Sequence, residues 1–182
     1  MARRLGSLGR PLLAVVVVAV VGALAFQLLV RESTAVPRLV PPRAAATLGE
    51  GDDAIAVGPN GAVLEWLALE EAAELPRLPL DAPPPNGRLQ GTVLEQAQVL
   101  GAAPAPLRPY IERSYYGESG IDVVLRSGIE LRFGDATQAT RKWQAAAVVL
   151  ADPSISALDY VDLRAPRRPA VDGSGHALPP LP

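Results

Sequence analysis

The residues that could perform catalysis are few, and their spacing gives no catalytic or metal site. The 182 residues include no cysteine and a single histidine, His176. Covalent catalysis needs a nucleophile beside a base that a third group orients. Because His176 lies in a run of proline and small polar residues that offers neither, we expect no catalytic or metal-binding role for it.

Two further motifs also fall short of a chemical site. Asp52 and Asp53 are adjacent carboxylates, but acid–base catalysis or calcium binding needs more oxygen atoms that converge from elsewhere in the chain. The Gly173–Gly175 triplet lacks the preceding strand and following helix that a phosphate-binding loop requires. The sequence therefore predicts a protein that is not an enzyme and holds no cofactor and no metal.

The charge balance argues against one class of partner. Seventeen basic and nineteen acidic residues give a net charge of −2, whereas binding of nucleic acid requires a basic patch or stripe. Interaction with other proteins is the function that remains.

An uncharged run from Pro11 to Val30 determines the expected compartment. Its twenty residues match the length of helix, about twenty residues, that crosses the hydrocarbon core of a bilayer. Arg3, Arg4 and Arg10 precede it, and the positive-inside rule keeps such a basic segment in the cytoplasm. We expect a cytoplasmic segment over residues 1–10, a transmembrane helix over Pro11–Val30, and the rest of the chain outside the membrane.

A cleavable signal peptide is the alternative interpretation of this run. Ala23–Ala25 is an A-x-A tripeptide behind an apolar segment, as at a cleavage site. The apolar stretch continues from Phe26 to Val30, however, and is longer than the usual 7–15 residues of a signal peptide, which favours an uncleaved anchor. Under both interpretations, the residues after this run lie outside the cytoplasm.

The first exported residues are predicted to form a linker and a small hairpin. Residues 31–42 show no periodicity and are predicted to be a linker, while Arg43–Leu48 could form a strand. Ala54–Val57 and Ala62–Trp66 flank Gly58–Gly61, whose Asn-Gly pair accepts the positive φ angles of a tight hairpin turn.

Proline and then helical periodicity mark the next segments. Pro76 and Pro79 lack the N–H of a sheet ladder, so Leu75–Leu80 is predicted to be an edge or extended segment. A loop is expected over Ala82–Gly87. Apolar residues recur at helical spacing from Arg88 to Leu100, which predicts an amphipathic helix.

The clearest pattern in the chain is a second hairpin. Apolar and polar residues alternate over Ile121–Leu125 and again over Ile129–Phe133. Ser127 and Gly128 between them form a two-residue loop. The alternation predicts two antiparallel strands that share one buried face.

A second helix is predicted after this hairpin. Asp135 and Gln138 have the spacing of a capping box, and apolar residues share one helical face between Ala139 and Asp152. Trp143 lies on this face. We expect both Trp143 and Trp66 to belong to the core.

One further strand completes the predicted fold. Leu158–Arg164 is predicted to be the last strand, and residues 172–182 are predicted to be a disordered tail because they are polar and rich in proline. The order of elements predicts one α+β domain over residues 43–171, in which two helices pack on an antiparallel-rich sheet, behind a single N-terminal transmembrane helix.

The predicted last strand is the candidate site for a partner. A last strand is often a sheet edge, whose unpaired backbone groups can pair with a strand of another chain. Val161 and Leu163 are expected to face the core, which leaves Tyr160, Asp162 and Arg164 for the partner or for water. The alternative is an ordinary edge strand, protected by its charges and the prolines beyond it.

Segments in five places along the chain resemble the FtsQ/DivIB family of bacterial cell-division proteins. They follow the membrane run in the family's order and are similar to its β domain. Together they span roughly residues 40–172. The similar segments are AIAVGPNGAVLE (54–65), LPRLPL (75–80), the hairpin and helix of residues 121–150, YVDLR (160–164) and PAV (169–171).

The resemblance implies a non-enzymatic, single-pass protein of the inner membrane that acts at the division septum. Family members bind FtsB/DivIC-type and FtsL-type partners through the last strand and the residues after it, which correspond here to Tyr160–Arg164 and then residues 165–171. The family also carries a POTRA domain before the β domain, and residues 31–42 are too few for one. Either the chain is a variant without POTRA or an internal part is missing.

A different class of function also fits the residues. The exported part could be an envelope binding domain, anchored or cleaved, that has no role in division. Position in the genome beside division genes, or localisation at the septum, would separate the two.

Overall fold

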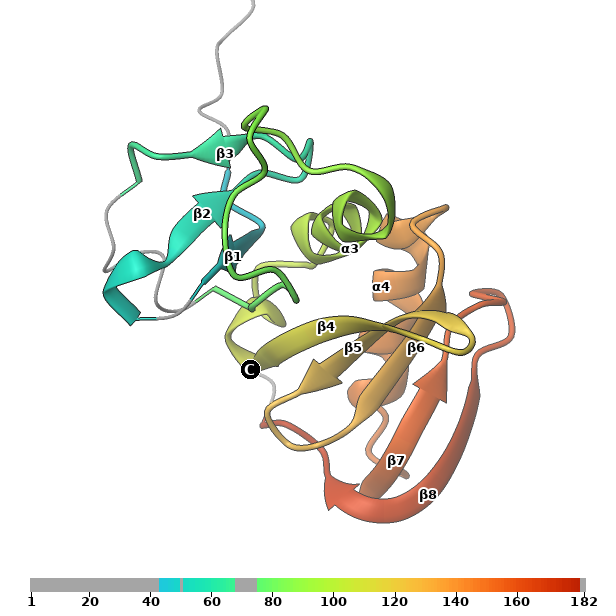
Figure 1. Cartoon of the computed structure of the whole chain (residues 1–182). Coiled ribbons are helices and arrows are strands. Elements are labelled where there is room, and N and C mark those ends of the chain that lie inside the picture. Colours follow the sequence, from blue (N-terminus) through green and yellow to red (C-terminus); the bar gives the residue numbers. More distant parts are fainter. Residues whose placement is uncertain (1–42, 50, 68–74, 181–182) are drawn as a thin grey trace, which may run out of the picture. The chain divides into compact units, whose positions relative to one another are not determined.

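The computed structural model describes residues 43–49, 51–67 and 75–180, all of which fall in one compact unit, Pro42–Pro182. The predicted membrane run lies outside these residues. Among the described residues, no helix is both long and apolar enough to cross a bilayer. The helices and strands, labelled in Figure 1, are β1 (Ala46–Leu48), η1 (Gly51–Asp53), β2 (Ile55–Val57), β3 (Val63–Leu64), α3 (Gly91–Gly101), η2 (Arg108–Tyr110), β4 (Ile111–Gly117), β5 (Gly120–Leu125), β6 (Glu130–Gly134), α4 (Ala139–Leu150), β7 (Ala157–Asp162) and β8 (Ala170–Ala177).

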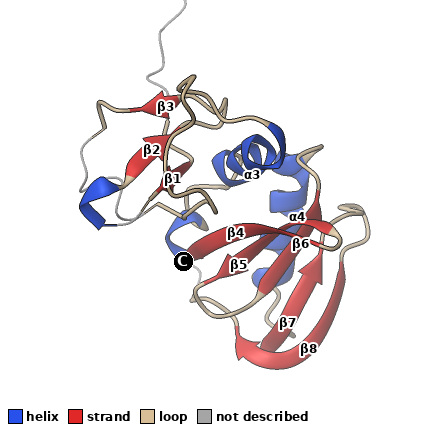
Figure 2. Cartoon of the chain, in the orientation of Figure 1, coloured by secondary structure: helices blue, strands red, loops and turns tan. Residues whose placement is uncertain are grey.

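A five-stranded sheet in the order β4-β5-β6-β7-β8 forms the larger half of the domain. Every neighbouring pair is antiparallel except β6 and β7, which run parallel and are connected through α4. Figure 2 shows α3 and α4 next to each other, with α4 behind the strands in this view. The prediction of an antiparallel-rich sheet with two packed helices is confirmed.

A three-stranded sheet, β1-β2-β3, precedes the larger one. Its hairpin turns at Gly58–Gly61 as predicted. The segment from Leu75 to Leu80 lies between the two sheets, since Arg77 bridges Thr47 of β1 on one side and Arg113 of β4 on the other. The proline-containing extended segment thus links the sheets, and the main core takes residues from both of them.

That core is centred on Trp143 and Phe133, both without exposed surface. Their ring centroids are 5.0 Å apart at an angle of 54°, a separation and tilt typical of favourable aromatic pairs. The indole N–H of Trp143 donates a 2.7 Å hydrogen bond to the carbonyl of Val99 in α3. This bond satisfies the one polar atom of a ring that packs α4 against both the sheet and α3.

Both predicted helices begin later than their patterns suggested. Arg88 still bridges Ala62 in the small sheet, and the N–H of Leu89 donates to Gly61, so α3 begins only at Gly91. Before α4, Gln138 adopts a left-handed conformation with φ of 53° and makes no side-chain capping bond. The predicted capping box is therefore wrong.

The Asp135 carboxylate of the expected capping box has a different role. It accepts hydrogen bonds from the backbone N–H and the hydroxyl of Thr137, at 3.0 and 2.6 Å. The ammonium of Lys142, almost fully buried, lies 2.6 Å from the same carboxylate and 2.8 Å from the carbonyl oxygen of Phe133. The hydrogen bond from Lys142 holds the pKa of Asp135 below its usual value. The chain's single lysine thus fixes the turn between β6 and α4.

Two other expectations differ from the structure. Trp66, expected in the core, is 62% exposed, because the chain turns out of the small sheet directly after β3. The strand β4 was not predicted, because a register shift between Ile111 and Arg113 breaks its alternation. Ile111 and Ser114 are both buried, and the two residues between them are charged and exposed.

Candidate partner-binding site

The predicted last strand forms, as β7, but it is not an edge. Val161 of β7 lies opposite Leu131 of β6 in parallel register and opposite Val171 of β8 in antiparallel register. Because both sides of β7 are paired, the prediction of an edge at Tyr160–Arg164 is wrong. The chain reverses over residues 163–169 and returns as β8, a strand whose polar, glycine-rich sequence gave no alternating pattern.

The five residues predicted to contact a partner lie on two faces of the sheet. Val161 and Leu163 have no exposed surface and belong to the core, as predicted. Successive side chains of a strand point to opposite faces. Tyr160, Asp162 and Arg164 therefore lie on the face without helices.

Each of these three outer residues already contacts another residue of the domain. The guanidinium carbon of Arg132 lies 3.7 Å from the centre of the Tyr160 ring, a cation–π contact. Asp162 accepts 3.0 Å hydrogen bonds from the backbone N–H and the Nε of Arg164. The hydrogen bond from Arg164 holds the pKa of Asp162 below its usual value.

The contacts continue across the helix-free face toward β4. Glu130 accepts a 2.6 Å hydrogen bond from Nε of Arg132 and a 2.7 Å bond from the hydroxyl of Tyr115. Burial raises the pKa of Glu130, but these two hydrogen bonds outweigh it and the pKa is lowered overall. Burial, followed by the bond to Glu130, raises the pKa of Tyr115 to about 12. The outer face is thus a connected polar layer.

One member of this layer is poorly satisfied. Asp122 of β5 pairs in register with Tyr115 on one side and Arg132 on the other. It is buried, and its Oδ1 atom has no hydrogen-bond partner. Burial, with repulsion from Glu130 as the next cause, raises the pKa of Asp122 to about 6.

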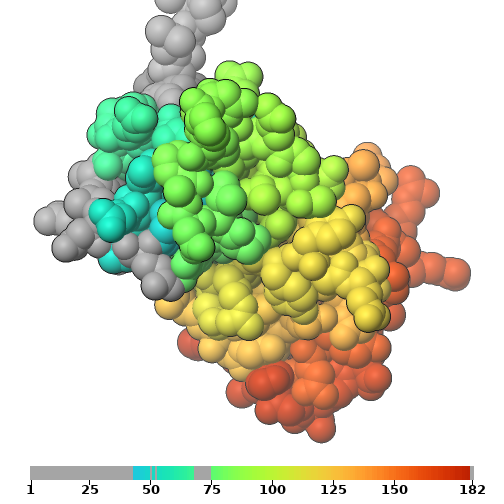
Figure 3. All heavy atoms as spheres, in the orientation of Figure 1, coloured from blue at the N-terminus to red at the C-terminus, as the bar shows by residue number. Residues whose placement is uncertain are grey.

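The strand β8 is the open edge of the large sheet. All of its residues from Ala170 to Ala177 are exposed, including Val171 at 43%. Among the described residues β8 pairs only with β7. In Figure 3 the C-terminal residues, coloured red, form one margin of the visible surface. An edge of this kind presents a row of free N–H and C=O groups.

The glycines of β8 are required by its packing on β7. The carboxylate of Asp159 accepts a 2.8 Å hydrogen bond from the N–H of Gly175. A Cβ atom at Gly173 would come within 2.1 Å of this carboxylate, and one at Gly175 within 2.4 Å. The Gly-Ser-Gly triplet thus belongs to a bulged strand that wraps around Asp159.

The segment around and after β8 is also held in place. His176 packs over the turn between β5 and β6, where a Cβ at Gly128 would lie 2.5 Å from its ring. Beyond β8, Pro179 is buried, and the carbonyl of Pro180 accepts a hydrogen bond from the hydroxyl of Tyr110. The prediction that residues 172–182 form a disordered tail is therefore wrong for residues 172–180. Residues 181–182 lie outside the described part of the chain. The described domain extends beyond its predicted end at Val171.

This arrangement offers backbone recognition and no evident reaction. In residues 43–49, 51–67 and 75–180, no cluster of three or more histidine and acidic side chains could hold a metal ion. What the described part of the site presents is an open strand, β8, next to a strand paired on both sides and a hydrogen-bonded polar face.

Comparison with known proteins identifies the family of the domain. Residues 47–164 match the sequence profile of a family described as cell division protein FtsQ/DivIB, C-terminal. A comparison with curated proteins finds no match. The matched region runs from β1 to the end of β7 and therefore includes both sheets and both helices, but not β8.

Proposed function

Because this chain belongs to the FtsQ/DivIB C-terminal family, a family of cell-division proteins, we propose that it is a non-enzymatic divisome protein that binds a partner strand along β8. The single observation that carries this proposal is the open edge: β8 is exposed along its length and paired on one side. In strand addition, main-chain hydrogen bonds supply affinity and alternate side chains supply specificity.

The predicted contact residues Tyr160–Arg164 support the binding strand in this proposal. Val161 and Leu163 anchor β7 in the core, and β7 holds β8 through its backbone ladder. The outer residues Tyr160 and Asp162 lie opposite Asp172 and Ala170 of β8. A partner strand added to β8 would lie one strand further out, with Val171 as the first exposed apolar contact.

The partners we propose are the FtsB/DivIC-type and FtsL-type proteins of the divisome. The support for these two is the family resemblance, in which the contact lies on the last strand and its surroundings. In this chain the last strand is β8, which moves the expected contact about ten residues beyond YVDLR.

We further propose that the chain is a single-pass protein of the cytoplasmic membrane, with residues 1–10 in the cytoplasm and the domain outside at the septum. The support is the uncharged Pro11–Val30 run behind three arginines. A reporter enzyme active only outside the cytoplasm, fused after Pro182, should be active and remain in the membrane fraction. A shortened, soluble product that begins at Phe26 would contradict the anchor.

Two adjacent proline substitutions test the edge itself. The N–H groups of neighbouring strand residues point to opposite sides, so of Val171→Pro and Asp172→Pro one removes an N–H from the β7 ladder and the other an N–H from the open edge. The variant that keeps the parent melting temperature identifies the edge position. Its binding of the FtsB/DivIC-type partner should fall at least tenfold, about 1.4 kcal/mol.

Two results, one from this experiment and one from localisation in cells, would contradict the proposal. Unchanged binding by the proline variant that melts like the parent would place the interface elsewhere. Absence of the protein from the septum, with binding of an envelope component unrelated to division, would favour an envelope domain outside the divisome.

A further inference from the structure

A groove on the small sheet forms a second surface that the proposed function does not use. We propose that this groove binds an extended segment of another protein that combines arginine or lysine with apolar side chains. Its lining residues fall within 53–67 and 81–83 and include none of β7 or β8, so the proposal stands independently of partner binding at the sheet edge.

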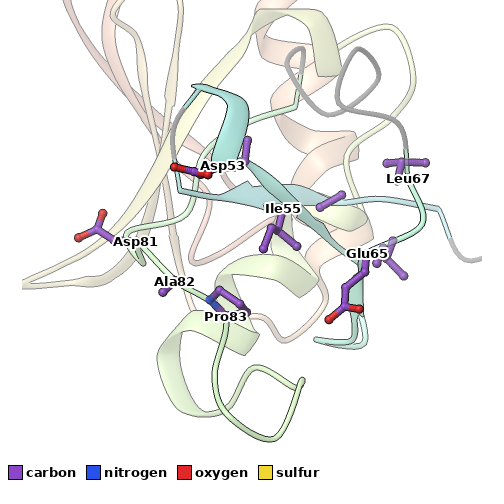
Figure 4. A pocket seen from close by; sticks show the side chains of 10 residues that line it. Asp53, Ile55, Glu65, Leu67, Asp81, Ala82 and Pro83 are labelled. Atoms are coloured by element: carbon purple, nitrogen blue, oxygen red, sulfur yellow. The ribbon is translucent and has the colours of Figure 1, made fainter.

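The floor of the groove is apolar and its rim is acidic. The groove has a volume of about 550 Å³, and its lining includes Ile55, Leu64 and Pro83 together with the carboxylates of Asp53, Glu65 and Asp81. Figure 4 shows the Ile55 side chain between β2 and Pro83, with Asp53 and Asp81 toward one side and Glu65 toward the other. None of the described residues that line it is basic.

The charge of the residues that line the groove is one-sided. Three of them, Asp53, Glu65 and Asp81, are acidic, although the whole chain has a net charge of only −2. Arg77 lies 3.3 Å from Asp81. In the described part of the chain, neither Asp53 nor Glu65 forms an ion pair. An occupant with positive charge would gain from both free carboxylates.

This charge argues against the other occupants that such a surface could have. An anionic membrane surface or a nucleic acid would be repelled. The chain's own neighbouring segment, residues 68–74, contains Glu70, Glu71 and Glu74 and would add like charge to the rim. A basic, apolar protein segment satisfies both the floor and the rim.

An exposed tryptophan lies beside the groove in sequence, although it is not among the residues that line the groove. Trp66 lies in sequence between the lining residues Glu65 and Leu67 and is 62% exposed. Tryptophan is enriched in the energetically important centres of protein interfaces, and its ring also attracts arginine or lysine. Trp66 would therefore contribute to the same apolar and cationic occupant.

Recognition at the groove must use side chains. Both outer strands of the small sheet are already covered in part, since Thr47 of β1 bridges Arg77 and the N–H of Val63 in β3 donates to the carbonyl of Gly87. Ala62 also bridges Arg88. Strand addition is therefore favoured at β8, and side-chain docking at the groove.

The test uses the full chain in nonionic detergent and labelled peptides of about nine residues, long enough to extend across roughly 30 Å. One peptide alternates arginine with leucine, one alternates glutamate with leucine, and one alternates arginine with serine. Fluorescence anisotropy should show binding of the first, no binding of the second, and at least fivefold weaker binding of the third.

Variants of the protein then place the binding on the groove. Asp53→Asn with Glu65→Gln should weaken binding of the arginine–leucine peptide at least fivefold, and Trp66→Ala should weaken it as well. Glu112→Gln with Glu118→Gln, exposed carboxylates on β4 and the turn after it, is the matched control and should bind like the parent. All variants should keep the parent melting temperature.

Three results would overturn the proposal. They are no binding of the arginine–leucine peptide, equal binding of the arginine–serine peptide, and equal loss of binding in the groove and control variants. The last would mean that only net charge attracts the peptide. None of these results bears on partner binding at β8.

Discussion

Two neighbouring strands, β7 and β8, share one ladder of hydrogen bonds and differ in almost everything else. β7 is paired on both sides and sends Leu158 and Val161 into the core. β8 is paired on one side, and all its residues are exposed. The comparison indicates that the strand with the clearer sequence pattern contributes to the core, and that the strand with the weaker pattern keeps an exposed edge.

The two strands are also stabilised by different interactions. β7 depends on apolar burial, whereas β8 depends on its backbone ladder and on the contact of Asp159 with the glycines of the bulge. Apolar burial is the dominant favourable contribution to folding. Substitutions in the core beneath β7 should therefore affect stability, and substitutions in β8 should affect binding with little change in stability.

The largest expected effect is at the centre of the core. Trp143→Ala should lower the free energy of unfolding by about 3–5 kcal/mol, as large aromatic truncations do, because the ring is fully buried and bonded to α3. Trp66→Ala is the matched control and should stay within about 0.5 kcal/mol, since Trp66 is exposed. Denaturant titration measures both, and equal effects would contradict the assignment of the core.

A smaller effect compares β7 and β8 with the same substitution. Val161→Ala removes buried methyl groups and should cost about 2–3 kcal/mol of stability. Val171→Ala, directly opposite in the register, should cost less than about 0.5 kcal/mol. If thermal unfolding shows equal losses, β8 is part of the core rather than an accessible edge.

The smallest effect depends on pH and on Asp122. The pKa of Asp122 is about 6 in the folded protein and 3.8 in the unfolded chain. Its contribution to stability is therefore complete at pH values below 3.8 and is lost as the pH rises through about 6. The stability difference between the parent and Asp122→Asn should therefore change by roughly 1–2 kcal/mol between pH 4 and pH 7, in favour of the variant at pH 7.

The comparison with the variant is needed because other carboxylates act in the opposite direction. Asp135 and Asp162 have lowered pKa values, so they contribute stability that is lost as pH falls. Subtracting the two pH profiles isolates Asp122. A constant difference across this range would contradict its raised pKa.

The sequence predicted the elements whose patterns come from burial. The hairpin of β5 and β6 and the buried face of α4 alternate or repeat regularly, because one side of each faces the core. Trp66 was wrongly predicted to be in the core, because the chain turns out of the small sheet directly after β3. The strand β4 was missed, because its register shift breaks the alternation. Asp135 has the sequence of a helix cap but is engaged by Lys142, a tertiary contact that spacing alone does not reveal.

The open edge of the sheet was predicted one strand away from where the structure places it. Val161 and Leu163 face inward as expected, but the edge is β8. A strand with Gly173 and Gly175 and no apolar alternation has little local preference for a sheet. It forms because β7 offers a free ladder and because Asp159 fills the space that two side chains would need.

Site-specific photocrosslinking in cells tests the central claim most directly. A benzophenone amino acid at Val171, exposed on β8, should crosslink to the FtsB/DivIC-type partner, while the same group at Val148, more exposed on α4, should not. Both proteins should melt like the parent, since neither side chain is buried. Crosslinking to that partner from Val148 and not from Val171 would contradict partner binding at the β8 edge.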